Sequence, residues 1–288
     1  MNSVSSTNLV SNGVLMSIDR VSKIRSGIAV SDNKLINACY RMSAVQKRMF
    51  NMAIAAFHSR KLNTGEVVFD VQDYAELAQT SLKEAIRVCR KESKKMSQLQ
   101  VVNIEYKEKR SLSPRQILEA DKREDNPDRE VARVSYKNFF QEVEFIDNSE
   151  IGDSDSCYMY FKFSDWLLPY VELIRKRFSK IPLLEVSTLS SFYALRIFDL
   201  GMGVGSIKGV RRREFDYQDF REMLGFVDDK KSMYSAWTDF RKRCLVDPLK
   251  ELNEKSSFKW SYSLIGRGKT RKIVITSVKD DQLNLPID

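Results

Sequence analysis

The sequence of 288 residues predicts an α+β fold in which one succession of helices and strands occurs twice. In each half, a short helix, a tight turn and a longer helix with a basic outer face precede a pair of strands. That succession is typical of a helix-turn-helix followed by a β-hairpin wing. The chain is therefore expected to fold into two tandem winged-helix domains with pseudo-twofold similarity.

The helix-turn-helix of the first half lies between residues 71 and 98. Residues 71–79 are expected to form its short helix. Ser81 and Glu84 form a capping box, which marks the start of a longer helix that runs to about residue 98. The outer face of this helix carries basic side chains that we predict to lie in a DNA major groove: Lys83, Arg87, Arg90, Lys91 and Lys94.

The helix-turn-helix of the second half is the stronger functional signal. Residues 217–224 form a short helix that Gly225 ends, because glycine tolerates the positive φ found after a helix C-terminus. In the longer helix, residues 231–246, an apolar stripe contains Met233, Trp237, Phe240 and Cys244. The opposite face is either a solvated surface or a DNA-reading one, and a second such motif in the chain favours DNA. We predict DNA contacts from Lys231, Ser232, Ser235, Thr238, Arg241, Lys242 and Arg243.

These residue types suit direct readout of bases. Arg241 or Arg243 is expected to pair with guanine O6 and N7, and Ser235 and Thr238 with thymine methyl groups or phosphates. The strands at 258–265 and 271–278 enclose a cationic turn and form the wing. On this wing we expect contacts to the DNA backbone or minor groove from Arg267, Lys269 and Arg271.

Around these motifs the chain divides at Pro182, which places a domain boundary near residues 180–185. The predicted units are a flexible arm or weak strand (1–31), an N-terminal winged helix (32–180), a C-terminal winged helix with the main sequence-specific contacts (181–279) and a flexible tail (280–288). Other expected elements are a helix begun by a Ser43–Gln46 capping box, strands at 66–69, 99–106, 131–146 and 157–163, helices at 164–178 and 187–201, a charged loop at 107–130, a basic loop at 201–213, and a break at Asp247 and Pro248 before a short helix at 249–255.

Composition favours a polyanionic partner. The 48 lysines and arginines exceed the 39 acidic residues and give a net charge of +9, and cations that neutralise phosphates release counterions. The four cysteines are scattered, with no disulfide framework or zinc spacing. No signal peptide or membrane-spanning run is visible, so we expect a protein of the reducing cytoplasm.

Enzymatic motifs are incomplete. His58 is the single histidine, and we expect it to be a structural or surface residue. Gly268, Lys269 and Thr270 resemble the end of a Walker A loop, but Ser263 stands where the first glycine is needed and the turn joins two strands. The glycine-rich segment at 201–205 follows a helix rather than a strand. We expect no catalytic residue, cofactor or metal site.

Four segments resemble one family, the iteron-binding plasmid replication initiators with two winged-helix domains. They are residues 37–48 (NACYRMSAVQKR), 163–171 (FSDWLLPYV), 191–200 (SFYALRIFDL), and 239–245 (DFRKRCL) with the wing at 266–275. Gln46 stands where the family pattern usually has glutamate. The segments span nearly the whole chain in the family's order.

The resemblance implies a protein that binds short direct repeats, or iterons, in double-stranded origin DNA, opens the origin and recruits host replication machinery. In the family both winged helices contact one repeat, and the C-terminal one makes most base contacts. Active initiators are monomers, whereas homodimers formed through the N-terminal domain repress their own gene. The implied partners are a host initiator, a helicase and chaperones, and the implied location is the bacterial nucleoid or the plasmid.

Two alternatives stay open on sequence alone. A transcription regulator with two winged helices would show the same DNA-binding pattern. An enzyme, either an integrase or an ATPase, belongs to a different class, and the incomplete Walker A loop and the single histidine argue against it.

Overall fold

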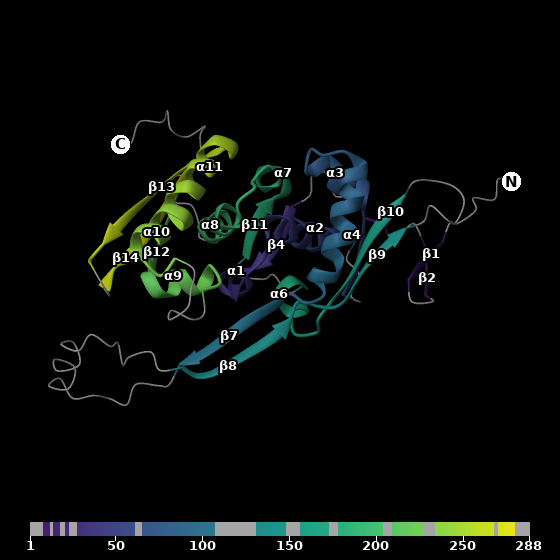
Figure 1. Cartoon of the computed structure of the whole chain (residues 1–288), viewed down its shortest axis with the longest axis horizontal. Helices are drawn as coiled ribbons and strands as arrows, with labels where there is room; N and C mark the ends of the chain where they lie inside the picture. The colour runs from purple at the N-terminus through teal and green to yellow at the C-terminus, as the bar shows by residue number, and fades with distance from the viewer. Residues whose placement is uncertain are drawn as a thin grey trace.

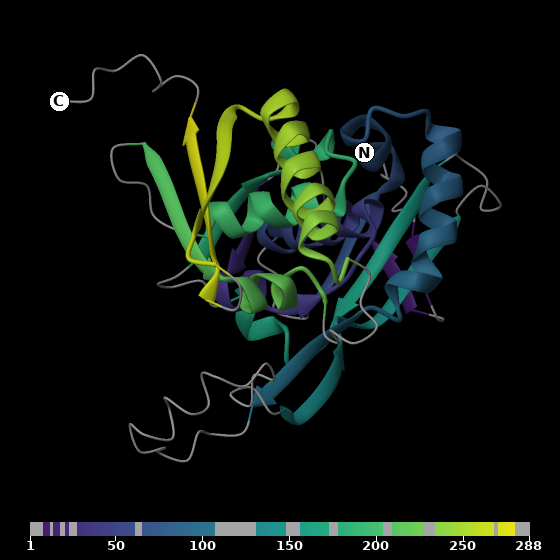
Figure 2. The same cartoon turned by 60° about the vertical axis from the view of Figure 1, so that its left-hand side comes forward.

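A computed structural model describes residues 8–11, 14–17, 21–22, 28–60, 65–106, 131–147, 156–172, 178–203, 209–226, 234–267 and 270–279. Figure 1 shows two units side by side along the long axis, with the N-terminal unit on the right and the C-terminal unit on the left. A two-stranded ribbon extends below them (Figures 1 and 2). No helix among the described residues is long and apolar enough to cross a membrane.

The first unit is a winged helix whose helices pack on an antiparallel sheet. Its elements are α2 (Ala44–Arg60), β6 (Glu66–Asp70), α3 (Val71–Leu77), α4 (Leu82–Met96), β9 (Phe140–Asp147) and β10 (Cys157–Phe163). The sheet order is β3-β6-β10-β9, where β3 (Val21–Ser22) lies parallel to β6. The last strand of the hairpin, β10, therefore lies between the strand that precedes the helix-turn-helix and the strand that follows it.

The second unit repeats this plan. Its elements are α8 (Phe192–Met202), β12 (Val210–Asp216), α9 (Tyr217–Met223), a long helix, β13 (Phe258–Ile265) and β14 (Lys272–Lys279). The sheet order β12-β14-β13 again places the last strand in the centre. The predicted pair of winged helices with pseudo-twofold similarity is confirmed.

An inserted ribbon distinguishes the first unit from the second. Strands β7 (Gln100–Tyr106) and β8 (Val131–Asn138) pair with each other, and β7 also pairs with β5 (Cys39–Tyr40), outside the domain sheet. The predicted strand at 131–146 is wrong in its continuity, because Phe139 is fully buried and turns the chain from the ribbon into β9. The wing of the first unit is thus the β9–β10 hairpin. The loop predicted at 107–130 lies outside the described residues.

Segments distant in sequence correct two local expectations. Residues 28–32 form β4 (Ile28–Asp32), which pairs with β11 (Phe178–Pro182), so this end of the predicted arm is an ordered strand. The predicted helix at 164–178 begins only at Leu168 of α6 (Leu168–Glu172), and Phe178 belongs to β11, while residues 173–177 lie outside the described residues. Long-range strand pairing overrides the local helical pattern there. The tail after residue 279 is outside the described residues.

Two further boundaries differ from expectation. The helix predicted at 187–201 begins later, at Phe192 of α8, because the Ser191 side chain caps α8 by accepting from the Ala194 N–H; Ser187 is the last residue of a separate helix, α7 (Leu183–Ser187). The predicted basic loop at 201–213 ends in a strand, since its arginine run lies in β12 and pairs with the buried central strand β14.

Both helix-turn-helix turns close with the same hydrogen bonds. After α3, the Gln79 N–H donates to the Glu76 carbonyl and the Thr80 N–H to the Ala75 carbonyl. After α9, Gly225 and Phe226 donate in the same way to Glu222 and Arg221. This is the Schellman pattern, whose first residue after the cap takes a left-handed conformation. Gln79 has φ +52° and Gly225 has φ +89°.

These two equivalent positions should respond oppositely to substitution. Gln79→Gly should stabilise the protein by about 0.5–1 kcal/mol, because left-handed φ costs a side-chain-bearing residue about 1–2 kcal/mol and glycine loses part of that gain through chain entropy. Gly225→Ala should destabilise it by about 2 kcal/mol or more. Its added Cβ would lie 2.7 Å from the Tyr40 carbonyl oxygen. Urea denaturation of the two variants measures both effects, and equal effects would contradict the assignment.

One large apolar cluster runs through both units, and a second, smaller one consists of Val68, Ile146, Tyr158 and Tyr160. Residues of α2, α8 and the long C-terminal helix belong to one buried cluster. All four cysteines are free and buried. Burial raises the pKa of Cys39 and of Cys244 to about 12, so these thiols behave as apolar core groups.

His58 is a structural residue of the first unit. Its Nε2 lies 2.9 Å from the Val30 carbonyl oxygen, which ties α2 to β4. Burial lowers the pKa of His58 below 6.5, and the hydrogen bond to Val30 opposes that shift only in part. The unfolded chain therefore binds a proton at a higher pH than the native protein does.

A pH dependence follows from this direction. The contribution of His58 to stability should be fully present above about pH 6.5 and should fall as the pH drops through its lowered native pKa. Because the chain has one histidine, its NMR titration gives that pKa without ambiguity. His58→Gln should remove this part of the pH dependence, and an NMR pKa above 6.5 would contradict the expectation.

Candidate nucleic-acid interface

The outer face of α4 places the predicted basic side chains in solvent. Ser81 caps the helix by accepting from the Glu84 N–H, as expected. The inner face buries Ala85, Cys89 and Met96 against the core. All five residues predicted on the outer face are exposed to solvent: Lys83, Arg87, Arg90, Lys91 and Lys94.

The two arginines of α4 are engaged, whereas the lysines of its outer face are not. Arg87 makes two hydrogen bonds to the Glu84 carboxylate, at 2.8 and 2.5 Å, and these hold the pKa of Glu84 below its usual value. The guanidinium of Arg90 bonds to Asp147 at the end of β9 at 2.5 Å and lies 4.9 Å from the Phe145 ring centroid. The remaining lysines of the face make no ion pair with another described residue: Lys83, Lys91 and Lys94.

The longer helix of the second helix-turn-helix begins later in the chain than predicted and also ends later. It consists of α10 (Trp237–Arg241), a π turn η4 (Lys242–Val246) and α11 (Asp247–Lys255) without a break. The predicted interruption at Asp247 and Pro248 is wrong. Proline has no N–H and crowds the carbonyl four residues earlier. The π turn removes this conflict, and the Asp247 N–H donates to the Lys242 carbonyl five residues back.

The N-terminal end of this helix begins at Trp237, not near residue 231. Tyr234 has φ +63° and therefore cannot be helical. The buried Arg221 of α9 donates to the Tyr234 carbonyl at 2.9 Å, which fixes the approach to the helix. Lys231, Ser232 and Met233 lie outside the described residues.

The outer face of the helix presents most of the side chains chosen from sequence. Phe240 and Cys244 are fully buried and Trp237 is half-buried, so the apolar stripe is confirmed at these positions. The residues on the opposite side are exposed: Ser235, Thr238, Arg241, Lys242 and Arg243.

Two contacts hold arginines on this face. Arg241 donates from Nε to the hydroxyl of Tyr262 on β13 at 2.7 Å, which leaves its terminal nitrogens available. Arg243 lies 3.8 Å from Asp247 one turn on. Because both side chains of that pair are exposed, water and salt screen the attraction. Tyr262 was not predicted, since no local pattern connects it with Arg241.

The wing is attached to the recognition helix by Arg271. Its guanidinium lies 3.9 Å from the ring centroid of Trp237 and 5.8 Å from that of Tyr217. Arg271 is half-buried in this position, whereas Arg267 in the turn is exposed. Lys269 lies outside the described residues. The stack connects the turn end of the hairpin with the first turn of α10.

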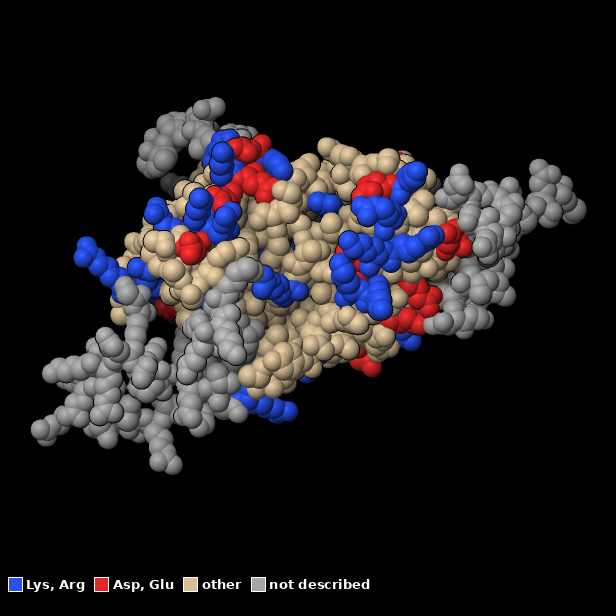
Figure 3. Space-filling model, in the orientation of Figure 1, with Lys and Arg blue, Asp and Glu red and all other residues tan. Residues whose placement is uncertain are grey.

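Lysine and arginine gather over α4 and over the α10–α11 helix on the same face of the molecule (Figure 3). On this face, acidic side chains lie at the margins of the α4 patch and among the cations of the second helix (Figure 3). Charge repulsion and attraction act over about 10 Å at 0.1 M salt. Both patches therefore suit one extended polyanion.

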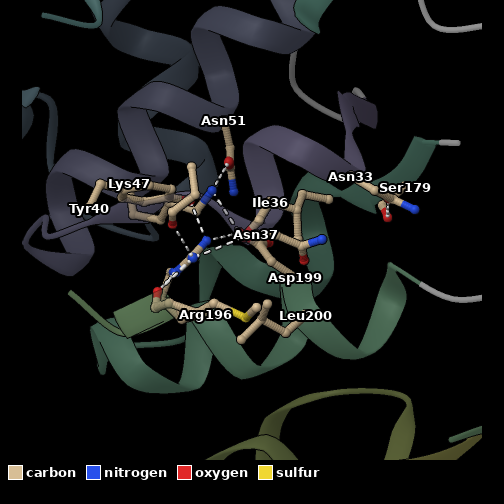
Figure 4. A network of polar contacts seen from close by, with 12 residues as sticks. Asn33, Ile36, Asn37, Tyr40, Lys47, Asn51, Ser179, Arg196, Asp199 and Leu200 are labelled. Carbon is tan, nitrogen blue, oxygen red and sulfur yellow. Dashed lines mark hydrogen bonds and ion pairs between the residues drawn. The ribbon is translucent and has the colours of Figure 1, made fainter. Parts of the chain in front are cut away.

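A buried polar cluster fixes the two units against each other (Figure 4). Lys47 of α2 lies 2.7 Å from Asp199 of α8, and both side chains are almost fully buried. Arg196, also on α8, bonds to the hydroxyl of Tyr40 at 2.5 Å and to the Met223 carbonyl at 2.7 Å. We call these four side chains, Lys47, Asp199, Arg196 and Tyr40, the interdomain clasp.

The clasp reaches the helix-turn-helix of the second unit directly. Met223 is the last residue of α9, and Gly225 packs on the Tyr40 backbone. A second arginine, Arg213 of β12, bonds to Asn37 at 2.7 Å and to the Leu200 carbonyl at 3.1 Å. Sequence reasoning did not identify the clasp, because its partners are far apart in the chain.

Comparison with known proteins agrees with this architecture. A family model described as initiator replication protein, WH1, matches residues 28–202, and one described as initiator Rep protein, WH2, matches residues 216–279. No curated protein matches the chain in sequence. The crystal structure of the Pi initiator protein in complex with iteron DNA matches with a TM-score of 0.63 and 18% identity, covering 90% of this chain and 100% of that chain.

A structure of RctB domains 2-3 also matches, with a TM-score of 0.35 and 8% identity, covering 83% of this chain and 81% of that one. Likeness at this level carries no functional argument. The match to the Pi initiator shows a shared fold.

Proposed function

The chain belongs to the family of initiator replication proteins with two winged-helix domains, and from that membership we propose that it starts plasmid replication by binding iterons in double-stranded origin DNA. The observation that carries the proposal is the pair of cationic helix-turn-helix faces on one side of the molecule. The interdomain clasp holds them in a fixed relation, so that one duplex can meet both faces.

The α10–α11 helix is the base-reading element of this proposal. Arginine recognises guanine through two parallel hydrogen bonds to O6 and N7. Arg241 has its orientation set by Tyr262 while its terminal nitrogens remain available, and Arg243 is exposed beside it. Thr238 and Ser235 offer hydroxyl and methyl groups at the N-terminal end of the same face.

The α4 helix has the character of a phosphate-binding element. Its arginines, which are the residues suited to bidentate base contacts, already bond to Glu84 and Asp147. Lys83, Lys91 and Lys94 are point charges on its solvent side, and phosphate contacts position a protein without reading sequence. We assign base readout to the α10–α11 helix, and we assign to α4 the phosphate contacts that position the protein along the DNA backbone. On the wing, Arg267 and Lys269 contact phosphates, and Arg271 positions α10.

The lysines of α4 give a direct test of this division. The triple variant Lys83→Ala, Lys91→Ala, Lys94→Ala should bind weakly to every duplex, and the slope of log K against log salt should fall by about 1 for each phosphate that is no longer neutralised. The ratio of specific to non-specific affinity should stay unchanged. Fluorescence anisotropy between about 50 and 200 mM salt measures both quantities. A changed ratio with an unchanged slope would contradict the assignment.

For the domain organisation we propose the four segments that the sequence predicts. The arm (1–31) precedes an N-terminal winged helix (32–180), and the second domain (181–279) begins with α7 and α8 and is followed by the tail (280–288). Support comes from α8, which packs against α11 and β14. The same helix also contributes the clasp residues that meet α2.

Regulation and partners are proposed on family grounds. We infer a homodimer, formed through the N-terminal domain, in equilibrium with the active monomer and repressing its own gene at an operator. The host initiator, helicase and chaperones are the expected protein partners, in the bacterial cytoplasm at the nucleoid or plasmid. We propose no enzymatic activity, so DNA nicking or ATP hydrolysis by the purified protein would overturn that part.

Footprinting separates the initiator from a transcription regulator. On DNA that flanks its own gene, an initiator should protect a ladder of regularly spaced repeats, whereas a pure repressor should protect a single palindrome. The gene together with those repeats should also sustain a plasmid that otherwise fails to replicate. Protection of a palindrome alone, without plasmid maintenance, would favour the regulator.

A further inference from the structure

The turn end of the β13–β14 wing has an apolar character that the fold does not require. Leu264 is 40% exposed and Ile265 is 44% exposed. They are consecutive in a strand, so their side chains point to opposite faces of the hairpin. Both faces of the wing therefore carry an apolar side chain at the last two residues of β13, directly before the turn.

The pattern along β13 changes at this level. On the outer face of the sheet, Lys259, Ser261 and Ser263 are polar and exposed, and Ile265 ends that polar series. The inner face begins with buried Phe258 and Trp260. Leu264 continues that inner face beyond the buried core. An exposed pair of large aliphatic side chains gains nothing from the solvated fold, since apolar surface is favourable only when water is removed from it.

Cations surround this apolar level. Ile265 pairs across the hairpin with Lys272, and Leu264 pairs with the buried Ile273. Lys272 bonds to Glu214 at 2.8 Å, while Arg267 beyond the strand end is exposed. An apolar tip beside cationic side chains suits the minor groove, where phosphates border the bases and an unstacked step exposes apolar base faces.

The position of the wing relative to the recognition helix supports the same partner. The stack of Arg271 on Trp237 holds the turn end of the hairpin, one residue before Lys272, against the first turn of α10. In Figure 1 the turn end of β13 and β14 forms the left edge of the second unit, beyond the helices. When the first turn of α10 lies in a major groove, the wing turn held beside it lies over the adjoining backbone and minor groove.

We propose that Leu264 and Ile265 form a wedge that the wing inserts into the DNA minor groove, where it unstacks a base step and bends the duplex. This inference rests on the proposed function, because it concerns the same DNA. Apolar wedges of this kind kink duplexes by about 20–90°. The wedge gives the protein a way to favour easily unstacked steps such as TA without a hydrogen bond to any base.

The test uses a duplex that the wild-type protein selects from a random-sequence pool. 2-Aminopurine replaces adenine at one position at a time, and a rise in its fluorescence on binding reports unstacking. The wild type should produce that rise at one step beside the major-groove site, together with a bend measured by energy transfer between the duplex ends. Leu264→Ser, Ile265→Ser in one chain should lose the fluorescence rise and most of the bend.

A matched control is Val210→Ser on β12. Val210 is 37% exposed in the same sheet but lies at the end opposite the wing turn, so the fluorescence rise and the bend should both persist. Should the double variant bind too weakly to measure, Leu264→Ala and Ile265→Ala are tested singly, and the bend must shrink while affinity changes by less than about tenfold.

The outcomes separate the wedge from the proposed function. If the wild type selects no sequence, the proposed function fails. If it binds a selected sequence without a fluorescence rise or a bend, or if the variants without the wedge residues keep both, the wedge is overturned and the function stands.

Discussion

Replacing Asp199 with alanine should lower the free energy of unfolding by about 3–5 kcal/mol, the usual cost of removing one partner of a buried ion pair. The ammonium of Lys47 would remain buried beside α8 without its carboxylate. Arg196 would also lose a carboxylate that lies 3.8 Å away. Urea denaturation monitored by circular dichroism measures the decrease.

The matched control is an exposed pair. Lys250 and Glu254 lie 3.9 Å apart on α11 with most of both side chains in solvent, so Glu254→Ala should cost at most about 1 kcal/mol. A compensated variant, Lys47→Met with Asp199→Leu, should recover the part of the loss that comes from the unpaired Lys47 ammonium, while Arg196 keeps its hydrogen bonds to Tyr40 and to the Met223 carbonyl. If Asp199→Ala cost no more than Glu254→Ala, the clasp would not be a stabilising contact.

The pH range of this contribution follows from Lys47. Desolvation is the largest single effect and lowers its pKa, but the attraction to Asp199 and Tyr40, together with the hydrogen bond to Asp199, outweighs it and leaves the pKa raised. The stability from a raised amine pKa is fully present below its unfolded value near 10.5 and is lost only as the pH rises through the native pKa. At neutral pH the clasp is therefore intact.

Alanine at Arg241 or at Arg243 should weaken binding to the selected sequence by about 1–3 kcal/mol for each bidentate arginine–guanine pair that is removed. Every 1.4 kcal/mol or so corresponds to about a tenfold change in Kd. Binding to unrelated duplexes should change much less, because only a phosphate-range attraction is removed there. Competition binding with guanine replaced at each position should show relaxed specificity at one base pair for each variant.

Tyr262 refines this prediction. Tyr262→Phe removes the hydroxyl that bonds to Arg241. It should weaken the free energy of binding to the selected sequence by about 0.5–1.5 kcal/mol, which is less than the effect of removing the arginine itself. Lys259→Ala, on the outer face of the wing sheet, is the control for a cation of the same domain and should leave specificity unchanged. If Arg241→Ala and Arg243→Ala both left specific binding intact, the assignment of the helix would be wrong.

Local chemistry in the sequence was sufficient for the helix-turn-helix units. The Ser81 cap, the Ser43–Gln46 capping box and the Gly225 turn are each specified by neighbouring residues, and each appears as predicted. The wing strands likewise follow their own alternating pattern. These features depend on contacts a few residues apart, where sequence patterns are informative.

The errors share a different origin. The pairing of β4 with β11 and the contact of Lys47 with Asp199 join segments more than a hundred residues apart, so no local pattern signals them. At Pro248, a π turn absorbs a residue that ordinarily ends a helix. In β12, the arginine run alternates between faces: Arg213 bonds to Asn37 in the domain interface, while Arg212 is exposed.

The solvent exposure of the chosen cations was predicted better than their hydrogen bonds and ion pairs. Most of the chosen cations lie on the expected solvent faces. What the sequence did not reveal is which of them are already bonded, because Asp147 and Tyr262 come from strands remote from their arginine partners. That difference decides which helix reads bases in our proposal.

Selection from a random duplex pool with three forms of the protein tests the central claim most directly. The wild type defines a sequence motif. The α4 variant that lacks Lys83, Lys91 and Lys94 should select the same motif with lower affinity, and the variant with alanine at Arg241 and Arg243 should lose the guanine preferences from it. A motif altered by the lysine changes, or one preserved without both arginines, would contradict the division of the reader into a phosphate-binding helix and a base-reading helix.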